Sequence, residues 1–63
     1  MTELQRVYNN MLVTLEKGLA DLEKFEDGNM SAGTRVRKAM QTVKELAQKT
    51  RIAVQEQKNA VAN

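Results

Sequence analysis

The sequence contains one strong helix break, the run Glu26-Asp27-Gly28-Asn29 near the middle of the chain, and it has no proline at all. Glycine adopts the left-handed conformation just beyond a helix end more readily than other residues, so Gly28 suits that position. Asn29 or Ser31 suits the cap of a following helix, since its side-chain oxygen accepts a hydrogen bond from a free backbone N–H. One break of this kind leaves room for a long helix on each side of it.

Apolar residues recur at helical spacing on both sides of the break, which predicts two amphipathic helices. The first stripe contains Leu4, Tyr8, Met11, Leu15, Leu22 and Phe25, and is widened by Val7, Leu12 and Leu19. The second contains Val36, Ala39, Met40, Val43, Leu46, Ala47, Ala53, Val54 and Val61. We therefore predict an all-α fold: helices over about residues 2–26 and 30–60, with a turn at 27–29, form one antiparallel helical hairpin that spans residues 1–63.

Each stripe is wider than contact with a single helix requires, which indicates further apolar contacts. A chain of 63 residues buries only about 60% of its unfolded surface. It has no cysteine for a disulfide, and it lacks the histidine and cysteine that usually bind structural zinc. Oligomerisation is the expected remedy, and the simplest form is a dimer of hairpins in a four-helix bundle, with a larger homo-oligomer as the other form.

Four residues interrupt the two stripes. Gly18 is interpreted as a place of close helix packing, and Gly33 as a permissive residue in the first turn of the second helix. Thr50 and Gln57 put polar groups at positions that face the predicted core, where they either set the register between helices or contact water.

The sequence offers little for catalysis. It has no histidine or cysteine, and Ser31, its only serine, occupies a cap position. The acidic residues before the turn are typical of a solvated helix end, and no phosphate-binding, dinucleotide-binding or calcium-binding motif is present. We expect no enzyme activity, no cofactor, no metal and no small-molecule substrate. The apolar runs are too short to span a membrane, and the polar residues 1–10 do not resemble a secretion signal.

The second half of the chain carries a cation at every seventh residue: Arg37, Lys44, Arg51 and Lys58. We call these four residues the cationic ladder. A seven-residue period drifts by only about 20° per step around a helix, so the ladder stays nearly in line over about 31 Å. Arg35 and Lys49 lie on the other flank of the apolar stripe, and Lys38 is a further outward cation near the turn. This pattern favours a polyanion as the partner.

The charges divide unevenly along the chain. Residues 1–30 hold six acidic and three basic residues, a net charge of −3, whereas residues 31–63 hold two acidic and seven basic residues, a net charge of +5. One interpretation is that the basic helix pairs with the acidic helix, but Glu23, Glu26 and Asp27 reach only the cations near the turn. The other is that most cations contact phosphates of duplex DNA, with little dependence on base sequence and a steep dependence on salt. Tyr8 and Phe25, the only aromatic residues, fit the apolar stripe, so base stacking is not expected.

The residues from the turn onward resemble a known family. The run Gly28-Asn29-Met30-Ser31-Ala32-Gly33-Thr34-Arg35-Val36-Arg37-Lys38, followed by Lys44-Glu45-Leu46-Ala47, Arg51 and Lys58, is similar to short bacterial linker-histone-like proteins related to the chlamydial nucleoid histone. The resemblance implies a self-associating protein that binds DNA and compacts the chromosome in the bacterial cytoplasm, or on a viral genome. It implies a DNA-binding role for Arg35, Arg37, Lys38, Lys44, Lys49, Arg51 and Lys58.

Two alternatives remain open from the sequence. A helical homo-oligomerisation or adaptor module would bind another protein through the apolar stripe, with the cationic ladder guiding the approach. An amphipathic helix on an anionic lipid surface is the other, although the stripe is rich in alanine and the chain has no tryptophan.

Overall fold

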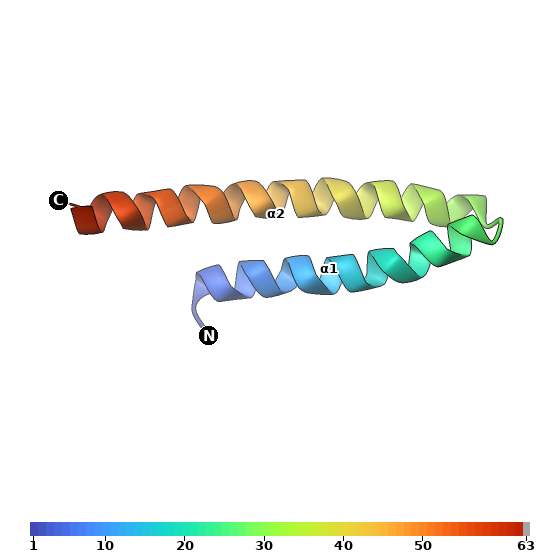
Figure 1. Cartoon of the computed structure of the whole chain (residues 1–63), viewed down its shortest axis with the longest axis horizontal. Coiled ribbons are helices and arrows are strands. Elements are labelled where there is room, and N and C mark those ends of the chain that lie inside the picture. Colours follow the sequence, from blue (N-terminus) through green and yellow to red (C-terminus); the bar gives the residue numbers. More distant parts are fainter. Residues whose placement is uncertain (63) are drawn as a thin grey trace.

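The computed structural model of the chain describes residues 1–62 and consists, over that range, of two helices, α1 (Glu3–Glu26) and α2 (Met30–Ala62). They run side by side in opposite directions, as Figure 1 shows. The result is a thin rod with extents of 54 × 19 × 11 Å. The helical hairpin predicted from the sequence is confirmed.

The N-terminal end of α1 is closed by a capping box. The backbone N–H of Gln5 donates to Oγ1 of Thr2 at 3.1 Å, and the backbone N–H of Thr2 donates to Oε1 of Gln5 at 3.0 Å. Two N–H groups that an α-helix leaves unpaired are thereby satisfied. Thr2 is therefore the N-cap, and the helix begins at Glu3.

The turn between the helices is a Schellman motif. Gly28 has a φ of 107°, its N–H donates to the carbonyl oxygen of Phe25 at 2.9 Å, and the N–H of Asn29 donates to that of Lys24 at 3.0 Å. This pair of bonds satisfies carbonyls at the end of α1 and explains why glycine occupies position 28. Asn29 is the residue that caps α2: its Oδ1 accepts the N–H of Ala32 at 3.2 Å and the hydroxyl of Ser31 at 2.8 Å.

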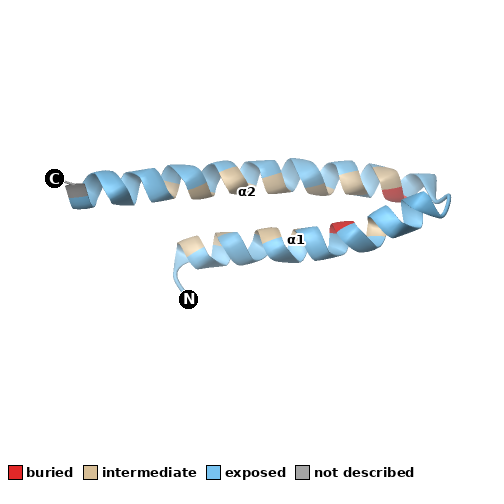
Figure 2. Cartoon of the chain, viewed as in Figure 1, coloured by how far each residue is buried: buried red, intermediate tan, exposed pale blue. Residues whose placement is uncertain are grey.

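Small residues allow the two helices to approach closely. Gly18 on α1 is buried, and a Cβ built on it would lie 3.6 Å from the Cβ of Ala39 on α2. Ala32 is also buried, and the half-buried residues of both helices line their facing surfaces (Figure 2). Gly18 is thus a packing residue, as predicted. It also defines the register, because position 18 on α1 lies level with position 39 on α2.

From this register the end of α2 extends beyond the start of α1. Glu3 lies level with about residue 54, so residues 55–62 have no part of α1 beside them over about 12 Å. We call residues 55–62 the overhang; it is visible at the C-terminal end in Figure 1. Gln57 lies in the overhang and is exposed, whereas the half-buried Thr50 donates its hydroxyl to the carbonyl oxygen of Leu46 at 2.9 Å. The polar group of Thr50 is satisfied within its own helix.

The rotation of α1 about its axis leaves much of its apolar stripe uncovered. Thr14 and Asp21 are half-buried beside α2, while Leu15 and Leu22 remain 44% and 40% exposed. The predicted stripe is thus wide enough to leave a surface that α2 does not cover. Apolar residues of this surface on α1 are Tyr8, Leu12, Leu15, Leu19 and Leu22.

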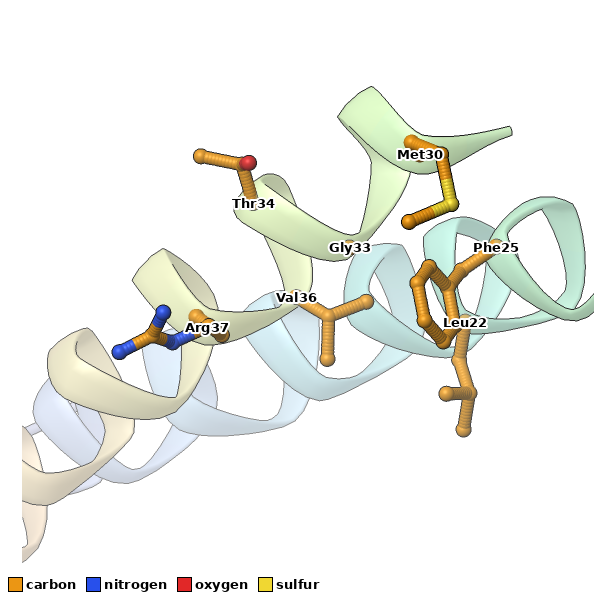
Figure 3. A pocket seen from close by; sticks show the side chains of 7 residues that line it. All are labelled: Leu22, Phe25, Met30, Gly33, Thr34, Val36 and Arg37. Carbon is orange, nitrogen blue, oxygen red and sulfur yellow. The ribbon is translucent and has the colours of Figure 1, made fainter. Parts of the chain in front are cut away.

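Gly33 has a role that differs from the predicted one. A Cβ built at this position would lie 2.7 Å from Cδ1 of Phe25, which is too close for two unbonded carbon atoms. The ring of Phe25 therefore packs over Gly33 because glycine has no side chain there (Figure 3). Gly33 is required for packing against α1, and its position in the first turn of α2 is incidental.

Candidate nucleic-acid interface

The hairpin has two long sides of different chemistry. On the first, which we call the apolar side, the open hollow along the helix pair is lined by Leu15, Gly18, Leu19, Leu22, Val36 and Met40. On the second, the polar side, the hollow is lined by Thr14, Lys17, Gly18, Asp21, Arg35, Lys38, Ala39 and Thr42. The predicted basic residues divide between these two sides.

The cationic ladder begins on the apolar side. Arg37 lines a hollow of about 330 Å³ near the turn, together with Leu22, Phe25 and Met30. Figure 3 shows the Arg37 side chain at the edge of this hollow, away from the ring of Phe25. Seven-residue spacing keeps the next three rungs, which are Lys44, Arg51 and Lys58, along the same edge of α2. All four rungs are exposed.

Arg35 lies on the polar side and has a partner. Its Nε is 2.8 Å from Oδ1 of Asp21, and the two side chains are 48% and 20% exposed. This ion pair crosses the hairpin, but its acid is Asp21 and not one of the residues nearer the turn. The register explains the difference, because Asp21 lies about level with position 36 and so faces Arg35. A partly exposed pair contributes no more than about 1 kcal/mol.

The remaining predicted cations have no such partner. In the part of the chain that the structure describes, the ion pairs are Arg35 with Asp21 and Arg6 with Glu3. No carboxylate of residues 1–62 therefore pairs with Arg37, Lys38, Lys44, Lys49, Arg51 or Lys58. All six are exposed, so the unpaired charge extends along most of α2.

One basic residue near these cations was not predicted. Lys17 on α1 lines the polar-side hollow together with Arg35 and Lys38, so both helices contribute positive charge there. The sequence contains a signal for it, since Lys17 and Lys24 repeat the seven-residue spacing on the first helix. The acidic composition of that helix hides this signal.

The turn residues Gly28 and Asn29 have structural roles, because they end α1 and cap α2. Tyr8, predicted to lie in the apolar stripe, is 57% exposed on the apolar side. Among residues 1–62, no group of acidic side chains converges as a metal site, and neither helix is long and apolar enough to cross a membrane.

The fold and its surface define a small helical-hairpin protein with a cationic face on its longer helix. A family model described as histone H1-like protein Hc1 matches residues 5–60, which is most of the chain. The chain belongs to this histone H1-like Hc1 family. No curated protein sequence and no solved structure matches it.

Proposed function

We propose that this protein binds duplex DNA through phosphate contacts, with little dependence on base sequence, and that it organises or compacts the DNA. Membership of a histone H1-like family supports a DNA-binding protein of the bacterial nucleoid. The observation that carries the finer proposal is the line of unpaired, exposed cations on α2. The proposed role is architectural and involves no catalysis, cofactor or metal.

The dimensions of the cationic ladder suit a duplex. Its rungs extend over about 31 Å of a nearly straight helix. Duplex DNA carries about one negative charge per 1.7 Å of its axis, so a helix laid against it meets phosphates along its whole length. Side chains that neutralise phosphates release condensed counterions, and binding of this kind weakens as salt rises. Phosphates carry no direct sequence information, which is why weak sequence preference is expected.

The test compares two matched triple variants. K49Q/R51Q/K58Q, which we call the ladder variant, removes two rungs of the cationic ladder and the neighbouring Lys49, all exposed and without an ion-pair partner. R6Q/K17Q/K24Q removes one arginine and two lysines from α1. We expect the first to reduce the affinity for a short duplex by at least about tenfold, and to reduce the magnitude of the negative slope of log K against log salt by about 2 to 3. The measurement is fluorescence polarisation at several salt concentrations.

The α1 variant is the control for net charge, because both variants lose three positive charges. It should lose less affinity than the ladder variant. Equal losses would show that only overall charge matters, and no binding of the wild-type protein at low salt would contradict the proposed function. Circular dichroism confirms that each variant keeps its helices.

We also propose that the hairpin associates with itself. The isolated chain exposes 5205 Å², whereas a compact monomer of 7.1 kDa exposes about 4,100 Å². Its excess of about 1,100 Å² is somewhat more than the area of about 800 Å² that one partner buries in a standard interface. An adaptor that binds a different protein is the second candidate, favoured by the same exposed apolar side; it predicts a monomer in isolation.

A further inference from the structure

The apolar side of the hairpin is arranged in parallel strips of different chemistry. Glu16 and Glu23 lie one turn from Leu12 and Leu19, at the outer edge of the leucine strip on α1. The leucines and Tyr8 come next, followed by the hollow with Met40 on α2. The cationic ladder forms the opposite edge. One edge of this side is therefore acidic and the other basic.

Two symmetric arrangements bring the apolar sides of two copies together, and they differ in which helices meet. If the two-fold axis is perpendicular to the helices, α1 meets α1 of the second copy and the cationic ladders lie alongside one another. If the axis is parallel to the helices, α1 meets α2 of the second copy and both turns lie at the same end. The first arrangement crowds like charges, whereas the second places the acidic edge against the basic edge.

We propose that the occupant of the apolar side is a second copy of this chain, packed with α1 against α2 of its partner and with both turns at one end. A two-fold axis parallel to the helices preserves the register along the rod. Position 16 then lies level with position 41 of the second copy, and position 23 with position 34, as in the hairpin itself. This inference specifies the interface of the proposed self-association and does not depend on DNA binding.

This register brings opposite charges within reach. Glu16 is three residues from the level of Lys44 in the second copy, and Glu23 is three residues from the level of Arg37, about 4.5 Å along the axis in both cases. Lysine and arginine side chains are long enough to cover that offset. The two acids and the two cations share a seven-residue spacing, so both contacts form in a single register, and symmetry doubles them.

The other two rungs of the cationic ladder find no such partner. Residues 1–15 contain one acid, Glu3, and it pairs with Arg6 at 3.3 Å. Arg51 and Lys58 of each copy therefore stay unpaired in the dimer and remain available for phosphates. The interface divides the cationic ladder into a half near the turn that holds the dimer together and a half toward the open end that binds DNA.

The test uses charge reversal on one helix at a time, without DNA. E16K/E23K and R37E/K44E each replace two attractive contacts by repulsive ones on both sides of the symmetric dimer. We expect each variant alone to dimerise at least about tenfold more weakly than the wild type. In an equal mixture of the two variants, a mixed dimer can form. In it, α1 of E16K/E23K packs against α2 of R37E/K44E, so the introduced lysines face the introduced glutamates. The other α1–α2 contact keeps the wild-type charges on both helices. The mixture should therefore dimerise within about threefold of the wild type, as measured by sedimentation equilibrium at low ionic strength.

A mixture of R37E/K44E with the wild type separates the two arrangements. If α1 packs against α2, the mixed dimer of wild type and R37E/K44E has one repulsive contact, so it is weaker than the wild-type dimer. With the ladders alongside one another, the two proteins would instead form a strong mixed dimer, which overturns the proposal, as would an E16K/E23K variant that dimerises normally. A wild-type protein that stays monomeric refutes self-association itself, whereas a dimer insensitive to these charges refutes only this interface.

Discussion

Gly18 and Gly33 are both glycines within helices, but the space around them differs. A Cβ at Gly18 would make an ordinary contact with Ala39 at 3.6 Å, whereas one at Gly33 would lie 2.7 Å from the ring of Phe25. Space for a methyl group therefore exists at the first position and not at the second. Glycine in a helix costs about 1 kcal/mol relative to alanine, so the same substitution should have opposite effects at the two sites.

We predict that G18A raises the free energy of unfolding by up to about 1 kcal/mol and that G33A lowers it by about 1 kcal/mol or more, because Phe25 must leave its place. Urea unfolding followed by circular dichroism, at one protein concentration, measures both. The double variant G33A/F25L provides the control: relief of the clash should make it more stable than the sum of the single changes. Similar stabilisation by G18A and G33A would contradict this account of Gly33.

Individual residues also differ in how far the sequence predicted their roles. The turn chemistry is local, so Gly28 was predicted at the end of the first helix. The sequence left the cap open between Asn29 and Ser31, and the structure shows that Asn29 caps α2. The partner of Arg35 was not predictable, because it depends on the register of one helix against the other. The lack of space for a side chain at Gly33 was not predictable either, because the space is filled by Phe25 on the other helix.

At the scale of the helices, the apolar stripe predicted that α1 exists, but it did not predict which face of α1 packs against α2. A stripe wider than one helix contact permits several rotations about the helix axis. The close approach at Gly18 and Ala39 selects one of them, which turns Thr14 and Asp21 inward and leaves Leu15 and Leu22 exposed. The expectation that apolar surface would be left over was correct, and the side on which it lies needed the structure.

The overhang gives a prediction for α2. Amide groups in residues 55–62 lack packing against α1, whereas those near Val36 to Val43 lie beside it. We expect amide hydrogen exchange at least about tenfold faster in the overhang, because local opening there breaks few apolar contacts. Residue-resolved exchange by NMR measures this, and uniform protection along α2 would contradict it.

At the scale of the whole molecule, the hairpin is nearly all surface. Among residues 1–61, only Gly18 and Ala32 are buried, and thirteen large apolar residues are exposed. A monomer with so little buried apolar area has little to offset the entropy of folding. Stability is therefore expected to come largely from association.

If the hairpin self-associates as proposed, its stability depends on protein concentration. We predict that the unfolding midpoint rises by several degrees when the protein concentration is raised about a hundredfold, because binding of folded copies shifts the equilibrium away from the unfolded chain. Thermal unfolding followed by circular dichroism over that range measures it. A midpoint independent of concentration would show that the hairpin is stable alone.

The length of the rod has a consequence for crowded DNA. Laid along a duplex, a body 54 Å long occupies about 16 base pairs, or about one and a half helical turns. Under the proposed function, molecules placed end to end on the same groove would therefore lie on nearly opposite faces of the duplex. If the protein binds DNA and dimerises as proposed, the partners in successive dimers would point away in alternating directions, and a single coated segment would reach neighbouring duplexes on both sides.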